Sequence, residues 1–201
     1  MITAKRIDAT SGPLVRQILL YSLPLILSTV LQNLFNAVDT AVLGNMADST
    51  AVASVGATGT VVSLIVNAFI GFPAGTRIVL ARFIGEKNPE KIRAAVDTSV
   101  ILAIAVGLII AVLGWIFSPL LLQMLNCPED CFEGASLYLQ VYFTAAPAIL
   151  LYNFCSGIIS TAGNTQSPLY YMIAGGILNV VLNILLCLIL PNKVAAVAIS
   201  T

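Results

Sequence analysis

TSVILAIAVGLIIAVLGWIFSPLLLQMLNCP, residues Thr98–Pro128, contains no charged residue and decides the class of fold. A transmembrane helix needs about 20 predominantly apolar residues, so this stretch is long enough to cross a membrane. Two other stretches, Ser49–Thr76 and Gly134–Asn192, also lack charge. The sequence therefore predicts a membrane protein built from helices.

The longest uncharged stretch divides at TAGNTQSP (Thr161–Pro168), where Gly, polar residues and Pro form a turn signal. It therefore holds two spans. We predict an all-α polytopic helical bundle with five complete transmembrane helices and the start of a sixth. The predicted spans are residues 17–43, 51–76, 97–121, 134–160, 168–190 and, cut off by the end of the sequence, 194–201. Pro24, Pro73 and Pro147 lie inside three spans and can kink them.

The amino-acid composition argues against several classes of function. Of 201 residues, 59% are hydrophobic and only 9% are charged, against about 25% charged in soluble domains. So few charged residues cannot cover a water-facing surface, so the lipid bilayer is the expected environment. The net charge of +0 suggests no nucleic-acid partner. With no His, no nucleophile motif and no Gly-rich phosphate loop, we expect neither an enzyme nor a cofactor. Cys127 and Cys131 are interpreted as incidental rather than as a disulfide or metal pair, because two ligands do not make a zinc site.

The basic residues predict the orientation. All but Lys193 either precede the first span or lie between the second and third: Lys5, Arg6, Arg16, Arg77, Arg82, Lys87, Lys91 and Arg93. The positive-inside rule then places the N-terminus in the cytoplasm of a multi-pass protein of the cell inner membrane. Residues 82–97 mix both signs at helical spacing and predict a solvated or interfacial amphipathic helix. A lipid-headgroup sensor is the weaker reading there, because the basic residues are not densely clustered.

Asp39 is the residue that points most directly to a function. A carboxylate in the hydrocarbon region costs at least about 2.5–3.5 kcal/mol and marks a functional site by default. Gln32 and Asn36 share its helix face because they precede it by seven and three residues. In the fifth span, Asn179 and Asn183 are one helical turn apart and also share a face.

These polar residues are predicted to meet at one depth. Asp39, Asn183 and Thr201 all lie about 12–14 Å from the same membrane boundary, and Asn179 lies one turn deeper. One carboxylate with amide and hydroxyl oxygens suits a hard cation such as Na⁺, and a buried carboxylate can also carry a proton. The alternative is a structural hydrogen-bond cluster between helices. Tyr142, at a similar depth, is either a partner of this cluster or a packing residue.

The same residues carry a family resemblance. Residues Pro24–Gly56 resemble the first-helix signature of the multidrug and toxic compound extrusion (MATE) family. Its N-x-V-D-T-x-x-x-G pattern is matched by Asn36, Val38, Asp39, Thr40 and Gly44. Three later segments resemble the loop after the fourth helix, the fifth helix and the start of the sixth: GIISTAGNTQSP (Gly157–Pro168), GGILNVVLNILL (Gly175–Leu186) and VAAVAIST (Val194–Thr201). The resemblance covers essentially the whole chain in order.

The resemblance implies twelve membrane helices in two lobes around a central cavity, with cationic and amphipathic drugs exported in exchange for Na⁺ or H⁺. Residues 1–201 would be the N-terminal lobe, whose partner, the C-terminal lobe, is absent from this sequence. By motif position, the coupling cation would bind at Asp39, Asn179, Asn183 and Thr201. Some members have Asp where this sequence has Asn183, which favours Na⁺ here. Candidates for the substrate path are Gln32, Asn36, Asn67 and Tyr142.

Two alternatives to drug export remain open. A flippase for a lipid-linked precursor, from the same superfamily, would usually show more basic residues in the central cavity, and the predicted spans contain none. A truncated, non-transporting membrane fragment is the second alternative, because one lobe cannot rock against an absent partner. A reading frame that continues past Thr201 would argue against the fragment.

Overall fold

The computed structural model describes residues 14–46, 49–190 and 193–200, and every element in these ranges is a helix. The helices are α1 (Leu14–Met46), α2 (Ser49–Gly85), α3 (Pro89–Met124), α4 (Glu129–Thr144), α5 (Ala146–Thr161), α6 (Gln166–Ile189) and α7 (Lys193–Ser200). Among the described residues, α1, α2, α3 and α6 are each long and apolar enough to cross a membrane, and α4 with α5 passes the same test as a bent pair, which gives four spans or five. The predicted all-helical polytopic bundle is confirmed.

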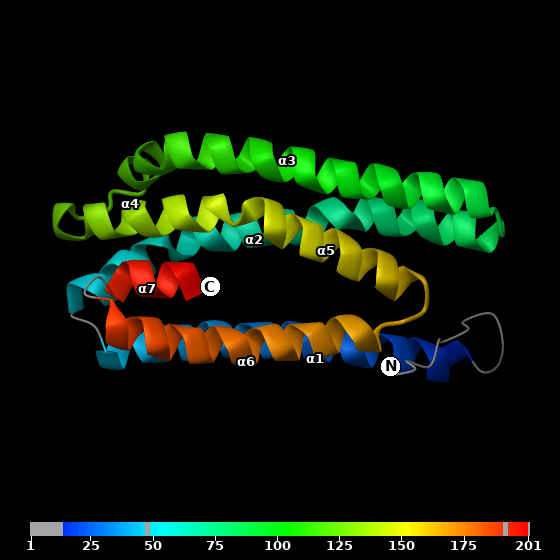
Figure 1. Cartoon of the computed structure of the whole chain (residues 1–201), viewed down its shortest axis with the longest axis horizontal. Helices are drawn as coiled ribbons and strands as arrows, with labels where there is room; N and C mark the ends of the chain where they lie inside the picture. The colour runs from blue at the N-terminus through cyan, green and yellow to red at the C-terminus, as the bar shows by residue number, and fades with distance from the viewer. Residues whose placement is uncertain (1–13, 47–48, 191–192, 201) are drawn as a thin grey trace.

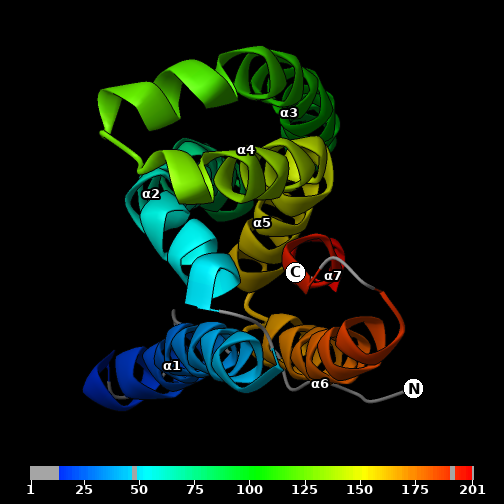
Figure 2. The ribbon, with the colours of Figure 1, turned by 90° about the vertical axis from the view of Figure 1, so that its left-hand side faces the viewer.

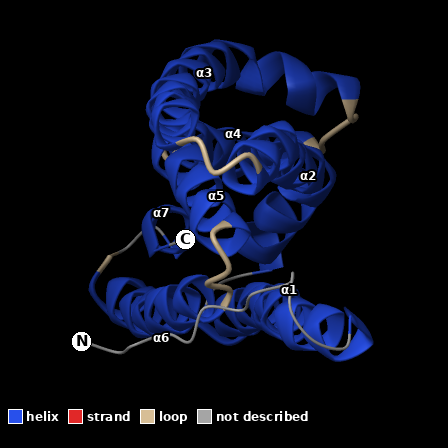
Figure 3. Ribbon diagram, turned by 90° about the vertical axis from the view of Figure 1, so that its right-hand side faces the viewer, coloured by secondary structure: helices blue, strands red, loops and turns tan. Residues whose placement is uncertain are grey.

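The helices form two groups. Helices α2, α3, α4 and α5 pack together, while α1 and α6 run side by side as a separate pair (Figure 1). Helix α7 lies between the groups and contacts both α4 and α6 (Figure 2). Figure 3, from the opposite end, shows the α5–α6 connection crossing from one group to the other.

The interior consists of three clusters of apolar side chains. One joins Tyr138 of α4 to Cys187 of α6 and to α7, and the second joins α2, α3 and α4. The third lies between α2, α3 and α5 and includes Phe69 and Phe154, each 1% exposed. Many large apolar side chains are instead exposed, Trp115 of α3 among them. Lipid can cover such surfaces, which is consistent with a membrane bundle.

The fourth predicted span is bent. Its two halves, α4 and α5, meet at 46°. Pro147 has no amide proton to continue the α-helical ladder, and the N–H of Ala145 is shared between the carbonyls of Val141 and Tyr142. Helix α3 approaches the bend closely, since a Cβ on Gly107 would lie 2.5 Å from the Cα of Pro147. By contrast, α1 and α2 continue as helices through their internal prolines.

The prediction of one amphipathic helix at residues 82–97 is wrong. Helix α2 continues to Gly85, and a three-residue turn leads into α3 at Pro89. Asn88 caps α3 by accepting a hydrogen bond from the N–H of Lys91 (3.1 Å), and proline suits the first helical position. The carboxylate of Glu86 accepts from Lys91 and Arg82, and these hydrogen bonds lower its pKa. The mixed charges therefore stabilise a tight turn between two spans.

Lys193 closes the opposite turn, between α6 and α7. Its Nζ donates to the carbonyl oxygens of Cys187 (2.6 Å) and Leu190 (2.9 Å), which are among the last acceptors of α6. A cation at this helix end also interacts favourably with the helix dipole. We expect Lys193→Met to lower the free energy of unfolding by about 1–3 kcal/mol, because both carbonyls lose a charged donor. Thermal unfolding in detergent measures this, and Lys193→Arg should retain most of the stability.

Candidate cation-coupling site

Two asparagines of α6 lie where α6 meets α7. Asn183 is 0% exposed, and its Oδ1 accepts a hydrogen bond from the Cys187 thiol (3.5 Å). Asn179, one turn earlier on the same face, donates from Nδ2 to the backbone carbonyl of Ser200 (2.8 Å). This bond ties the middle of α6 to the last described residue of α7.

The amide oxygen of Asn179 is buried and has no hydrogen-bond partner in the described part of the chain. The unpartnered amide atom is the oxygen and not the nitrogen. The other amide atom of Asn179 faces the carbonyl of Ser200, which can only accept a hydrogen bond, so that atom must be the NH₂ nitrogen. Buried acceptors are nearly always satisfied in native proteins, and an exception calls for an unseen donor, water or ion. The Asn179 oxygen is therefore available to a cation.

The contact between α1 and α6 fixes the level of Asp39. A Cβ on Gly176 would overlap the ring of Phe35, so the two helices touch at these residues. Helices α1 and α6 run in the same direction (Figure 1). Asp39 follows Phe35 by four residues, and on α6 Asn179 and Asn183 follow Gly176 by three and seven. The backbone of Asp39 thus reaches a level between the two asparagines, about 6 Å along α1 from Phe35.

Parts of the predicted site lie outside the described residues. Thr201 is one of them, and for Asp39 and Asn36 the backbone but not the side chain is described. The predicted ligand set therefore stays a prediction. What the structure places together is Asn179, Asn183 and the carbonyl of Ser200, at the junction of α6 and α7.

The other predicted substrate-path residues lie elsewhere. Gln32 of α1 is exposed. Asn67 of α2 is exposed too, and its amide donates to the carbonyl of Ser63 within its own helix (2.7 Å). Tyr142 of α4 is buried and stacks on Tyr138, with ring centroids 6.3 Å apart. This stacking favours a packing role for Tyr142.

The sequence did not predict that Ser200 takes part in the junction of α6 and α7. Ser200 takes part through its backbone carbonyl, which every residue possesses, so no pattern of side chains could single it out. The only indication in the sequence was that Ser200 directly precedes Thr201, which was a predicted cation ligand. Within the described ranges, no group of three or more His, Cys, Asp or Glu is placed to hold a metal ion. A Na⁺ site would depend instead on amide, carbonyl and hydroxyl oxygens with one carboxylate, ligands that hard cations accept.

Known transporters match the chain in sequence. The MatE family model matches residues 24–185. The chain is 27% identical over 197 residues to the probable multidrug resistance protein YpnP of Bacillus subtilis, covering 98% of this chain and 44% of that protein. It is 23% identical over 190 residues to the multidrug export protein MepA of Staphylococcus aureus, covering 94% and 42%.

Solved structures match the fold. A MOP superfamily transporter from Pyrococcus furiosus superposes with a TM-score of 0.88 at 24% identity, over 100% of this chain and 44% of that one. A MATE protein crystallised in a bent conformation gives 0.85 at 25% identity, over 92% and 41%.

Together, the membrane-length helices and the shared fold define a multi-pass helical membrane protein. The chain belongs to the MatE family. This family consists of transporters rather than enzymes, and the predicted resemblance is confirmed. The chain spans less than half the length of the curated relatives it matches, 44% in the case of YpnP.

Proposed function

We propose that the protein to which this chain belongs exports drugs in exchange for a cation, and that this chain holds the cation site. The site would consist of Asp39, Asn179, Asn183 and Thr201. The observation that carries the proposal is the unpartnered Oδ1 of Asn179, buried one turn from the fully buried Asn183. Relatives named as multidrug resistance and multidrug export proteins support drugs as the substrate.

Na⁺ is the proposed cation and a proton is the alternative. The described acceptors at the site are amide and carbonyl oxygens, which can complete the shell of a metal cation but cannot take up a proton at neutral pH. A single carboxylate, Asp39, then balances the single charge of Na⁺. Binding would draw α1 toward the junction of α6 and α7 and so alter the surface offered to a drug. Drug and cation would then exclude each other, which is the requirement for exchange.

Dye export under defined ion gradients tests this function. Cells that lack their own drug exporters would express the protein, and the accumulation of ethidium would be followed by fluorescence. We expect export that stops when external Na⁺ is replaced by choline at constant pH. Export that follows only the pH gradient would overturn Na⁺ as the cation, and an absence of export would overturn the function.

Asn183 offers a sharper test of the site itself. Asn183→Ala removes a buried amide oxygen, and we expect the concentration of Na⁺ needed for half-maximal export to rise about tenfold, the equivalent of one good hydrogen bond. Asn153→Ala is the matched control, since that amide donates only to the carbonyl of Ile149 in its own helix. Equal effects of the two substitutions would argue against a cation site on α6.

A flippase would usually show more basic residues in the central cavity. Helix α2 does continue through Arg77, beyond the predicted end of its span at residue 76. However, its guanidinium packs against α5 at Gly157. One basic side chain held between two helices does not form a basic cavity, and we therefore favour the exporter.

A further inference from the structure

We propose that Arg77 binds the phosphate group of a membrane lipid where α2 meets α5. The site consists of Arg77, Gly157 and Ser160 and is separate from the cation site. It recognises the lipid by its phosphate oxygens, which an arginine fork can bind with two parallel hydrogen bonds.

Helix α5 is shaped to admit the guanidinium. A Cβ on Gly157 would lie 2.8 Å from Nε of Arg77 and 3.5 Å from its Nη2. Any side chain larger than that of glycine would therefore have to displace the charged group. The arginine fork rests directly on the backbone of α5.

Three polar groups on α2, on α5 and in the connection after α5 are buried without a hydrogen-bond partner among the described residues. Nε of Arg77 is buried without a hydrogen-bond partner among the described residues. The hydroxyl of Ser160, three residues after Gly157 on the same face of α5, is also buried and unpartnered. The hydroxyl of Thr165, in the short connection after α5, is a third buried group without a partner in the described part of the chain. A guanidinium is always charged, and leaving its buried Nε–H unpaired is costly, so we expect an acceptor at this position.

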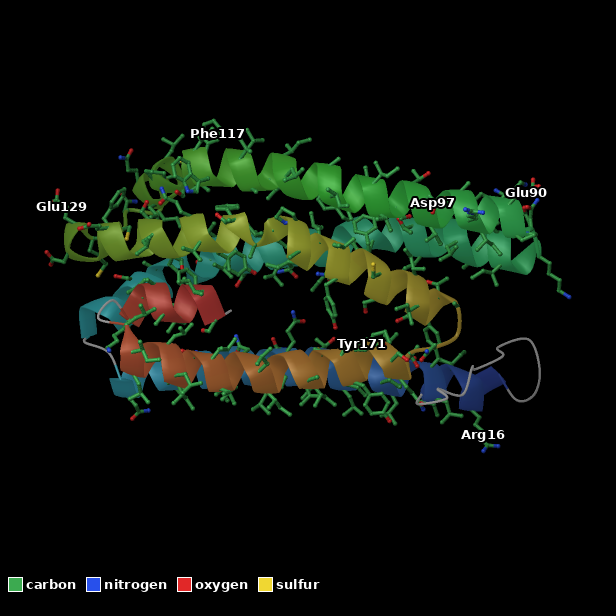
Figure 4. The ribbon with its side chains drawn as sticks, in the orientation of Figure 1. Arg16, Glu90, Asp97, Phe117, Glu129 and Tyr171 are labelled. Carbon is green, nitrogen blue, oxygen red and sulfur yellow. The ribbon has the colours of Figure 1, made fainter. Side chains whose placement is uncertain are left out.

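The described carboxylates do not supply that acceptor. Glu86 is bonded to Arg82 and Lys91, and Asp97 lies 3.9 Å from Arg93. The acidic residues of α4 lie at the other end of the bundle, as Glu129 shows in contrast to Glu90 and Asp97 (Figure 4). A ligand rich in oxygen would satisfy the guanidinium.

The depth of Arg77 matches a lipid phosphate. The uncharged part of α2 ends at Thr76, and Arg77 is the first charged residue after it. The hydrocarbon core of a bilayer extends about 15 Å from its centre, with the headgroups just beyond. An arginine at this level can extend its fork to the phosphates of one leaflet.

Lipid retention by the full-length protein tests the proposal. The protein would be reconstituted in nanodiscs of phosphatidylglycerol and phosphatidylcholine, and native mass spectrometry would count the phosphatidylglycerol that stays bound after release. We expect Arg77→Gln to lower retention about tenfold, the loss of a charge-assisted hydrogen bond. Arg82→Gln is the matched control, because that side chain is 77% exposed and already paired with Glu86. Its retention should be unchanged.

Two further variants separate binding from folding. Arg77→Lys keeps the charge but not the fork, and should retain an intermediate amount of lipid. Gly157→Ala keeps the arginine but displaces it, and should lose lipid as Arg77→Gln does. Equal retention by wild type and Arg77→Gln, or equal loss in the Arg82→Gln control, would overturn the proposal. Displacement of the lipid by excess inorganic phosphate would show a site for free anions instead.

Discussion

Asp39→Asn is expected to abolish cation-driven export while the protein still inserts and folds. The substitution removes the only charged residue between Arg16 and Asp48. A carboxylate in the hydrocarbon region costs at least about 2.5–3.5 kcal/mol, so its neutral replacement should not destabilise the helix. What is lost is the negative charge that we propose balances the cation. Ethidium accumulation should match that of cells without the protein, at an unchanged amount of protein in the membrane.

The controls for Asp39 distinguish charge from position. Asp39→Glu keeps the carboxylate on a longer side chain and should export weakly. Asp97→Asn removes an exposed carboxylate whose partner is Arg93, and export should be unaffected because surface pairs contribute little. Export that persists in Asp39→Asn would contradict the proposed site. Loss of the protein from the membrane would show that Asp39 has a structural role instead.

Gly176→Leu is expected to have the largest structural effect of the substitutions considered. Even a single Cβ at this position would overlap the ring of Phe35, so a leucine must push α1 away from α6. Overpacking of this kind costs about 1–3 kcal/mol and sometimes more. It also separates the backbone level of Asp39 from Asn179 and Asn183. We expect a lower unfolding temperature in detergent together with a loss of export.

The neighbouring glycine provides the control. A Cβ on Gly175 would meet nothing within 4 Å, so Gly175→Leu should change stability little. Adding Phe35→Ala to Gly176→Leu removes the ring and should restore part of the stability. If Gly175→Leu and Gly176→Leu were equally harmful, the close approach of α1 and α6 would not be the cause.

The sequence predicted the spans from the absence of charge, and this works because the hydrocarbon region excludes charged groups. It does not predict where the helices end. Arg77 and Arg82 were assigned to a connection, yet both lie within α2, because a helix continues through charged residues wherever they can reach headgroups or partners. The contact between Arg77 and Gly157 was missed for this reason, and also because the two residues are distant in the sequence.

The candidate site was predicted only in part for a related reason. Helical spacing correctly put Asn179 and Asn183 on one face, and the structure buries Asn183 completely. The partner of Asn179 is a carbonyl of α7, and which carbonyl it meets depends on how α7 packs back against α6. Likewise, three prolines could have kinked their helices, but the 46° bend occurs near Pro147, where α3 presses against the chain through Gly107. Such close contacts between helices are not encoded in local spacing.

The bend between α4 and α5 also determines how little chain is needed to join the two helix groups. Helix α5 has 16 residues, so a 46° turn carries its end about 17 Å sideways from the line of α4. That displacement exceeds the diameter of a helix. The four residues 162–165 then suffice to begin α6 beside α1 (Figure 1). Without the bend, the same four residues, which extend at most about 14 Å, would also have to make up this sideways displacement of about 17 Å.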